Sequence, residues 1–271
     1  MAEESGPVEL ELGKIIGRKW KIMDKLGEGG CGSVYLVQDT KLKAKAAMKA
    51  ESNFVAGGSV LKLEVQILKR MQGRKFVAQL ISSGKKERYS YMVMTLFGAS
   101  LSRLFKQCKK EFSVSTQIRL GMQILYGLKQ LHEVGYIHRD VKPANLAVGP
   151  KRCRSQNNFG LAREYIIRSE GSVEMRKPRE NTLFRGTTKY CSANTHARNE
   201  QGRPDDLWSM VYLLTEMRGA LPWEHVRDKH EVGEMKNAIT DEKLLSKCPP
   251  QMMLIAEHLR TLDYLSDLII K

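Results

Sequence analysis

The spacing of apolar residues predicts short strands in the first third of the chain. Residues 20–26 and 33–37 read as two strands joined by a glycine-rich turn, and residues 46–49 form a short apolar strand. Between residues 61 and 71, apolar side chains recur at spacings of three, four and seven, which is the pattern of an amphipathic helix. Residues 91–98 read as a buried strand that runs into a glycine.

Longer helices are expected in the rest of the chain. One covers residues 113–134, with Ser113 as a suitable cap and Gly135 as a suitable stop. Its apolar side chains recur at helical spacing and are expected to belong to the core: Ile118, Met122, Leu125 and Leu128. A further helix is expected over residues 249–262.

Residues 138–145 read His-Arg-Asp-Val-Lys-Pro-Ala-Asn and bring an acid, a cation and a carboxamide together in eight positions. Asp140 can accept the proton of a hydroxyl, Lys142 can neutralise a moving phosphoryl group, and Asn145 can hold a magnesium ion. A motif of this length rarely arises by chance. The stretch resembles the catalytic loop of eukaryotic protein kinases.

That resemblance implies a phosphate-covering hairpin near the start of the chain. Gly27, Gly29 and Gly32 follow the spacing G-x-G-x-x-G ahead of Val34, and glycines let a backbone approach phosphates without side-chain clash. An ordinary glycine-rich hairpin is an equally good reading of the spacing alone. A dinucleotide-binding turn is disfavoured, because residues 34–37 are of β type and no helix opens there.

Lys49 ends the short apolar strand, where a kinase lysine contacts the α- and β-phosphates. A surface lysine is the alternative reading. Glu64 lies on or beside the apolar face of the first helix, and a carboxylate in that place needs a cation. In this architecture Lys49 is its natural partner, whereas a solvated glutamate at the edge of the face is the alternative.

The strand over residues 91–98 would then lead into the connector between two lobes. The resemblance implies that backbone groups of this connector bind adenine, with Met94 standing behind the base and Leu96 also at the ATP site. Taken without the resemblance, the segment could be any core strand.

The second half resembles the casein kinase 1 group in particular. The resemblance rests on residues 184–196 and 202–209, where Ser-Ala-Asn at 192–194 replaces the Ala-Pro-Glu of most kinases. Three segments are similar to the tau-tubulin kinase branch of that group: residues 206–209, 221–223 and 262–264, which read Asp-Leu-Trp-Ser, Leu-Pro-Trp and Leu-Asp-Tyr.

The same resemblance implies roles for further polar residues. Asp206 is expected to begin a buried helix and to brace the catalytic loop around Arg139, with an ordinary helix cap as the competing account. Lys189 and Arg203 are expected to form an anion pocket for a phosphate on the substrate or on the chain itself.

One position departs from the kinase pattern. Asn158-Phe159-Gly160 stands where kinases carry Asp-Phe-Gly, so a neutral amide replaces the carboxylate that chelates magnesium. A loss of several kcal/mol at this metal site would slow transfer by about a hundredfold to a thousandfold. The activity could therefore be weakened, or the chain could be a catalytically inactive binding module.

Composition restricts the remaining choices. The 45 lysines and arginines against 30 acidic residues give a net charge of +15, which favours acidic or phosphorylated protein partners. Nucleic acid is the least favoured partner because no aromatic-and-basic recognition motif accompanies the charge. Five cysteines without a C-x-x-C pair, and no apolar leader, indicate a reduced intracellular protein, cytoplasmic or nuclear. The lack of a long apolar run argues against a membrane span.

The sequence thus predicts an α+β, bilobal protein-kinase fold. The first lobe is expected to hold a small antiparallel sheet and one helix, and the second lobe mostly helices. The protein is expected to act as a monomer. Residues 1–15 are expected to form an extension, residues 16–96 the first lobe and residues 98–271 the second, with an abbreviated end. The expected activity is transfer of the ATP γ-phosphate to serine or threonine with Mg²⁺ or Mn²⁺. The alternative is an inactive pseudokinase that binds acidic or phosphorylated partners.

Overall fold

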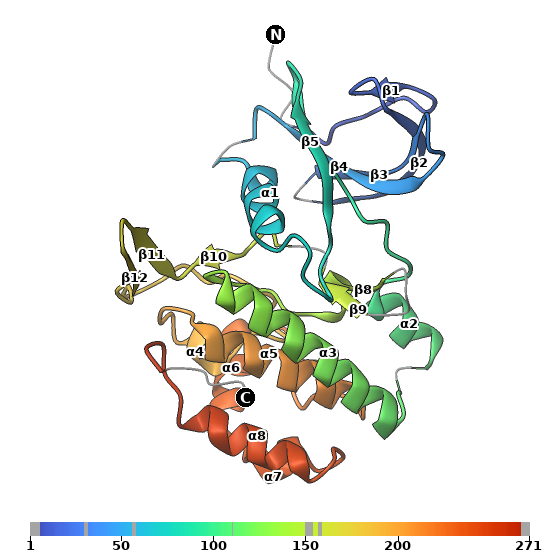
Figure 1. Ribbon diagram of the computed structural model, residues 1–271. Helices are drawn as coiled ribbons and strands as arrows, with labels where there is room; N and C mark the ends of the chain where they lie inside the picture. The colour runs from blue at the N-terminus through green and yellow to red at the C-terminus, as the bar shows by residue number, and fades with distance from the viewer. Residues whose placement is uncertain are drawn as a thin grey trace.

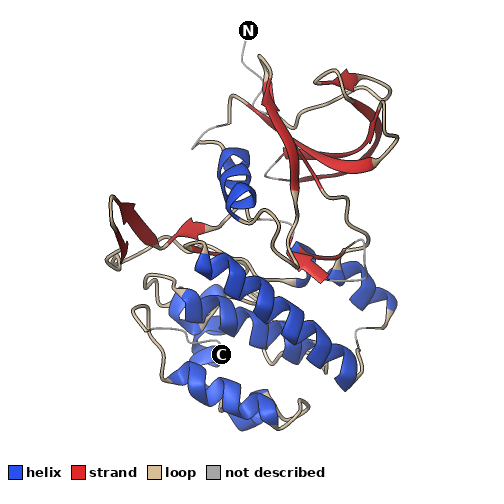
Figure 2. Cartoon of the chain, in the orientation of Figure 1, coloured by secondary structure: helices blue, strands red, loops and turns tan. Residues whose placement is uncertain are grey.

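The computed structural model describes residues 6–29, 32–55, 58–109, 111–149, 154–156 and 159–266. An upper lobe is built around a curled β-sheet, and a lower lobe consists mostly of helices (Figure 1). Figure 2 shows the same division, with the large sheet above and all but one of the larger helices below. The predicted α+β, two-lobed fold is confirmed.

The sheet has six antiparallel strands in the order β1-β2-β3-β4-β6-β5. Their bounds are β1 (Ile15–Ile16), β2 (Trp20–Gly29), β3 (Gly32–Asp39), β4 (Lys45–Ser52), β5 (Leu80–Lys85) and β6 (Tyr89–Met94). The strands predicted over 20–26, 33–37 and 46–49 lie within β2, β3 and β4. The strand predicted over 91–98 is shorter, because β6 ends at Met94 and an irregular connector follows.

Among the described residues of the upper lobe, one helix, α1 (Val60–Arg70), packs against this sheet. Its N-terminus is capped by Ser59, whose side chain accepts the backbone N–H of Lys62. The predicted apolar face is real, since Leu61 and Leu68 are almost fully buried. They belong to an apolar cluster that continues into the lower lobe, so α1 is packed against both lobes.

The lower lobe is organised around two long helices, α3 and α5, which pack against each other. Its helices are α2 (Leu101–Gln107), α3 (Val114–Glu133), α4 (Ala193–His196), α5 (Arg203–Glu216), α6 (Lys229–Ala238), α7 (Asp241–Leu244) and α8 (Gln251–Arg260), with the single-turn η1 (Pro143–Asn145). Its short strands pair in twos: β7 (Tyr136–Ile137) with β10 (Arg163–Glu164), β8 (Leu146–Val148) with β9 (Arg154–Gln156), and β11 (Ile166–Ser169) with β12 (Ser172–Met175). Within the described residues, no helix combines the length and apolar character needed to cross a bilayer.

The helix predicted over 113–134 is present as α3, and Ser113 caps it by accepting the N–H of Thr116. The predicted core face of this helix was partly wrong, because Ile118 and Met122 are 48% and 66% exposed. The buried side chains follow a neighbouring stripe instead: Leu120, Ile124, Leu128 and Leu131. Both stripes are apolar and step along the helix by three or four residues, so spacing alone could not choose between them.

Candidate active site

Lys49 and Glu64 form an ion pair in the interior, between the sheet and α1. The Lys49 Nζ lies 2.5 Å from Oε2 of Glu64, and the two residues are 6% and 1% exposed. The second carboxylate oxygen of Glu64 accepts the backbone N–H of Phe159 at 3.0 Å. One carboxylate therefore joins α1, strand β4 and the segment that begins at Phe159.

The glycine-rich turn is a hairpin between β2 and β3, in which Gly27 pairs with Val34 and Gly29 with Gly32. Gly32 has φ +102°, and a Cβ there would lie 2.2 Å from the carbonyl oxygen of Ala50. Only glycine fits this position, both for its backbone conformation and for its closeness to β4. Gly27 has no atom within 4 Å of its would-be Cβ, so its side of the hairpin is open.

The residues predicted to surround adenine belong to one apolar cluster. Met94 pairs with Ala47 of β4 and with Leu80 of β5, and Val34 and Leu96 pack against the same cluster. Val34 is also the register partner of Lys49, so the apolar cluster and the lysine predicted to contact the phosphates are adjacent. Ala47 was not singled out from the sequence, although its position two residues before Lys49 places both side chains on one face of β4.

Asp140 lies at the centre of the catalytic loop. Its Oδ1 accepts the hydroxyl of Thr187 at 2.6 Å, and its Oδ2 lies 2.8 Å from the Nζ of Lys142. The Lys142 Nζ also donates to the Thr187 hydroxyl at 2.9 Å. The structure thus brings the predicted base and the predicted phosphate neutraliser together. Thr187 was missed as a site residue, because no local pattern links it to a loop 47 residues earlier.

Asn145 lies on the same side of the loop. Its amide nitrogen donates to the backbone oxygen of Asp140 at 2.8 Å and to its Oδ2 at 2.9 Å. The amide oxygen is the chemically suitable ligand for a hard divalent cation, as predicted for Asn145. The other predicted metal ligand, Asn158, lies outside the described residues. No group of three or more His, Cys, Asp or Glu side chains in the described part of the chain could hold a metal.

Asp206 fixes the backbone of the catalytic loop from below. Its carboxylate accepts the N–H of His138 at 2.7 Å and the N–H of Arg139 at 2.8 Å, and it lies 2.8 Å from Nε2 of His132. Burial alone would raise the pKa of Asp206, but the bonds from His132 and the loop outweigh it and lower the pKa. The helix-capping role belongs to its neighbour Asp205, which accepts the N–H of Gly202.

Arg139 adopts φ +64° and donates through Nε to the carbonyl oxygen of Leu161 at 2.6 Å. Burial, together with three nearby arginines, lowers its pKa to about 10. These neighbours are Arg163, Arg179 and Arg185. Glu200 pairs with Arg163 and Arg179, so one carboxylate partly offsets a concentration of positive charge beside the catalytic loop.

Lys189 and Arg203 have different partners. Lys189 pairs with Glu216 at 2.5 Å and also with Glu224, and these carboxylates outweigh its burial and raise its pKa. The Arg203 guanidinium donates to the carbonyl oxygen of Ser266 and lies over the ring of Tyr165. The anion pocket predicted for this pair stays a prediction.

Comparison with known proteins agrees with this geometry. The family model of the protein kinase domain matches residues 20–266. A Caenorhabditis elegans protein, assigned provisionally by its name to the serine/threonine-protein kinases, is 50% identical over 96% of this chain and 77% of its own length. A Dictyostelium discoideum protein with a similarly provisional kinase name is 38% identical over 93% of this chain, and the chain spans about half (51%) of that relative.

The tau-tubulin branch is also represented. A C. elegans protein named as an inactive tau-tubulin kinase is 35% identical over 74% of this chain and 75% of its own length. The resemblance inferred from residues 184–196 and 262–264 is confirmed. With the catalytic loop, the Lys49–Glu64 pair and the family model in agreement over nearly the whole chain, this protein belongs to the protein kinase family.

Proposed function

We propose that this chain is a serine/threonine protein kinase that transfers the γ-phosphate of ATP to protein hydroxyls. The observation that carries the proposal is the set of contacts around Asp140. Its two carboxylate oxygens are fixed separately, one by Thr187 and the other by Lys142 and Asn145. A carboxylate held in this way is positioned to accept the proton of a substrate hydroxyl.

The other residues have distinct tasks in such a transfer. Lys142, within hydrogen-bond distance of the base, neutralises charge on the phosphoryl group as it moves. Lys49 is held by Glu64 and contacts the nucleotide phosphates, which the hairpin with Gly27 covers. Met94, Leu96 and Val34 supply the apolar walls for adenine. Asn145 and Asn158 would hold a divalent cation, Mg²⁺ or Mn²⁺, which neutralises phosphate charge when bound.

The contacts among the described site residues favour an active enzyme over a pseudokinase. The Lys49–Glu64 pair is closed, and Glu64 also holds the backbone of Phe159, directly after the unusual Asn158. The catalytic loop is braced by Asp206 at two successive backbone N–H groups. These features assemble the site for chemistry, and the side chain at position 158 takes part in none of these bonds.

The substrate class we propose is an acidic or phosphorylated protein. The net charge of +15 favours acidic partners, and the arginines beside Arg139 concentrate that charge close to the catalytic loop. Lys189 and Arg203 belong to this proposal as a second anion-binding element. The chain is expected to act as a monomer, with lobes over residues 16–96 and 98–271.

The proposal is tested by phosphate transfer from γ-labelled ATP to an acidic generic protein, with Mg²⁺ or Mn²⁺. Wild-type protein is compared with Asp140→Asn and Asn158→Asp. Activity that disappears in Asp140→Asn supports an enzyme that tolerates asparagine at the metal site. If wild type transfers no phosphate and Asn158→Asp does, the proposal is overturned in favour of a binding module.

A further inference from the structure

Lys236 of α6 is a buried cation outside the set of site residues described above. It is 1% exposed, and among the described residues no carboxylate lies within ion-pair distance of its Nζ. Burial lowers the pKa of Lys236 to about 8, so the side chain is still mostly charged at neutral pH. An ammonium group buried without a carboxylate is costly, and its position must therefore be supported by other partners.

The closest partners of Lys236 are backbone carbonyl groups of one short segment. Its Nζ donates to the carbonyl oxygen of Thr188 at 2.6 Å and to that of Cys191 at 2.7 Å. It also lies 3.4 Å from Nε2 of His196, a ring that stays neutral because burial lowers its pKa to about 4. Each of the three ammonium N–H groups thus has an acceptor, and two of the acceptors lie within residues 187–191, which we call the 187–191 segment.

Two aromatic rings complete the surroundings of the ammonium group. The Lys236 Nζ is 5.1 Å from the ring centroid of Tyr212 in α5 and 5.0 Å from that of Trp223, which is within the range of cation–π attraction. The indole N–H of Trp223 also donates to the carbonyl oxygen of Lys189 at 2.9 Å. Three carbonyl groups of the 187–191 segment are therefore held by donors from α6 and from the loop that precedes it.

The 187–191 segment begins at Thr187, whose hydroxyl bonds to the proposed base Asp140 at 2.6 Å. The backbone N–H groups of Tyr190 and Cys191 both donate to the carbonyl oxygen of Thr187 at 2.9 Å, so the segment is a single tight turn. Because these bonds join the end of the turn to its start, donors that hold the later carbonyl groups also fix the position of Thr187.

We propose that Lys236 is a positioning residue for phosphate transfer, which acts on Asp140 through the 187–191 segment and Thr187. It holds the Thr187 hydroxyl at the place where Asp140 is oriented. Since the substrate hydroxyl must lie beside Asp140, the same anchor shapes the surface along which the protein substrate binds. The effect on transfer rests on the proposed kinase function, whereas the anchoring of the segment does not.

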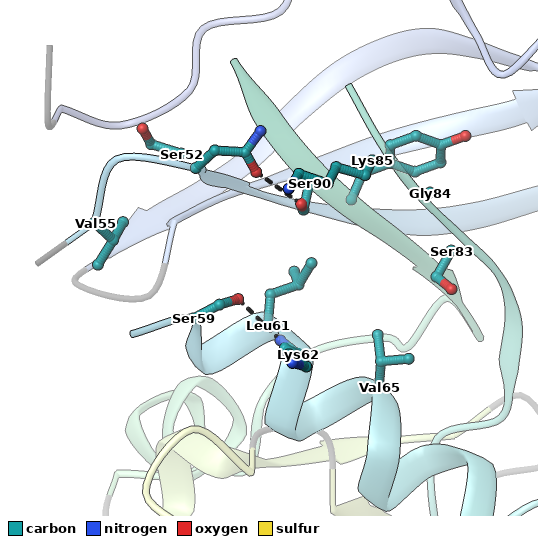
Figure 3. A pocket seen from close by; sticks show the side chains of 12 residues that line it. Ser52, Val55, Ser59, Leu61, Lys62, Val65, Ser83, Gly84, Lys85 and Ser90 are labelled. Carbon is teal, nitrogen blue, oxygen red and sulfur yellow. Dashed lines mark hydrogen bonds between the residues drawn. The ribbon is translucent and has the colours of Figure 1, made fainter. Parts of the chain in front are cut away.

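The upper lobe takes no part in these contacts. Figure 3 shows the cavity between α1 and the strands β4, β5 and β6, and none of its lining residues belongs to α5, α6 or the 187–191 segment. Lys49 and Glu64 likewise belong to β4 and α1. A change at Lys236 should therefore reach the base and the protein substrate, and leave the binding of ATP as it is.

The test compares the full wild-type chain with Lys236→Met, in which a side chain of similar length can donate no hydrogen bond. Steady-state kinetics and amide hydrogen exchange are measured on each protein. The control is Lys243→Met, which removes the same charge from an exposed lysine of α7. Trp223→Phe is a second variant, which removes the bond to Lys189 and keeps an aromatic ring beside Lys236. It keeps the proposal testable if Lys236→Met does not fold.

We expect Lys236→Met to lower kcat by about tenfold and to raise the KM for the protein substrate by about fivefold. The KM for ATP should stay within about twofold of wild type. Amide hydrogen exchange in residues 188–191 should be faster by about tenfold or more. Trp223→Phe should shift the same quantities in the same direction by a smaller factor, and Lys243→Met should match wild type.

A double variant separates positioning from a general loss of structure. If Lys236 acts through Thr187, its replacement should matter little once the Thr187 hydroxyl is gone. In a chain that already carries Thr187→Val, Lys236→Met should therefore lower kcat by less than about threefold. A full further loss of about tenfold would overturn the route through Thr187.

The remaining outcomes separate the anchor from the proposed function. Exchange in residues 188–191 that equals wild type, in Lys236→Met or, if that variant does not fold, in Trp223→Phe, overturns the anchor whatever the activity. Faster exchange with unchanged kcat and KM overturns the effect on Asp140. Faster exchange in a chain whose wild type transfers no phosphate supports the anchor and overturns the proposed kinase function.

Discussion

The hydroxyl of Thr187 donates a 2.6 Å hydrogen bond to Asp140, the proposed catalytic base, and also accepts one from Lys142. Thr187 lies six residues before the start of α4 at Ala193, so this contact joins the catalytic loop to the segment that leads into α4. The position of the base is thereby linked to the conformation of a distant part of the chain.

Replacement of Thr187 by valine should lower kcat by about tenfold to a hundredfold, the scale expected when a catalytic group is misplaced. Valine keeps the shape of threonine but cannot bond to Asp140 or Lys142. The KM for ATP should change little, because Thr187 contacts none of the residues at the nucleotide site. Steady-state kinetics check both values, and Thr187→Ser should retain most of the activity. A valine variant as fast as wild type would show that this bond has no role in positioning Asp140.

Removal of Glu64 should be costly, because it leaves Lys49 buried without its counter-charge. We expect Glu64→Ala to lower the free energy of unfolding by about 3–5 kcal/mol and to abolish most phosphate transfer. The matched control is Glu133→Ala, which breaks an exposed pair with Arg74 and should cost less than about 1 kcal/mol. Urea unfolding measures both. An equal loss of free energy of unfolding in the two variants would contradict the view that the Lys49–Glu64 pair matters more because it is buried.

Gly32→Ala should destabilise the β2–β3 hairpin by about 1–3 kcal/mol, because alanine is strained at φ +102° and its Cβ would collide with the oxygen of Ala50. The KM for ATP should rise with it, since the hairpin would be displaced from the nucleotide. Gly27→Ala is the control, because open space surrounds that position. Thermal unfolding measures the stability of the two variants, and ATP titration measures their KM. Equal stability and equal KM in the two variants would contradict the close approach of Gly32 to β4.

Stability should fall in acid through His196. Burial, and then the nearby charge of Lys236, lower the pKa of His196 to about 4. Between that value and the unfolded pKa near 6.5, the unfolded chain binds a proton that the folded chain does not, so stability rises with pH. The stability that the neutral His196 side chain contributes is therefore complete above pH of about 6.5, and it is lost as the pH falls toward 4. Urea unfolding at several pH values measures how the free energy of unfolding depends on pH. This free energy should change less with pH in His196→Gln than in wild type, and an equal dependence in the two proteins would refute this assignment.

Much of the fold and site could be predicted because it depends on local patterns. The helix α1, the hairpin with Gly32 and the catalytic loop each have their signal in a few consecutive residues. Contacts between distant segments had no such signal, and the bonds of Thr187 and of Phe159 N–H were therefore missed.

The face of α3 could not be read from the sequence for a different reason. Both of its stripes are apolar, and the buried one is selected by contact with α5, including a bond from the Gln117 amide to the carbonyl oxygen of Leu214. Gln117 is 1% exposed, although a polar residue would not be assigned to the core by its type. Only the packing partner reveals which stripe is inside.

The position of Asp206 has a consequence for how such proteins can diverge. Its carboxylate ties α5, α3 and the catalytic loop together without involving any metal ligand. The attachment of the catalytic loop to α5 and α3 therefore does not depend on the metal-binding side chains. A metal-binding side chain can therefore be exchanged, as at position 158, while the bonds that hold the catalytic loop in place stay the same.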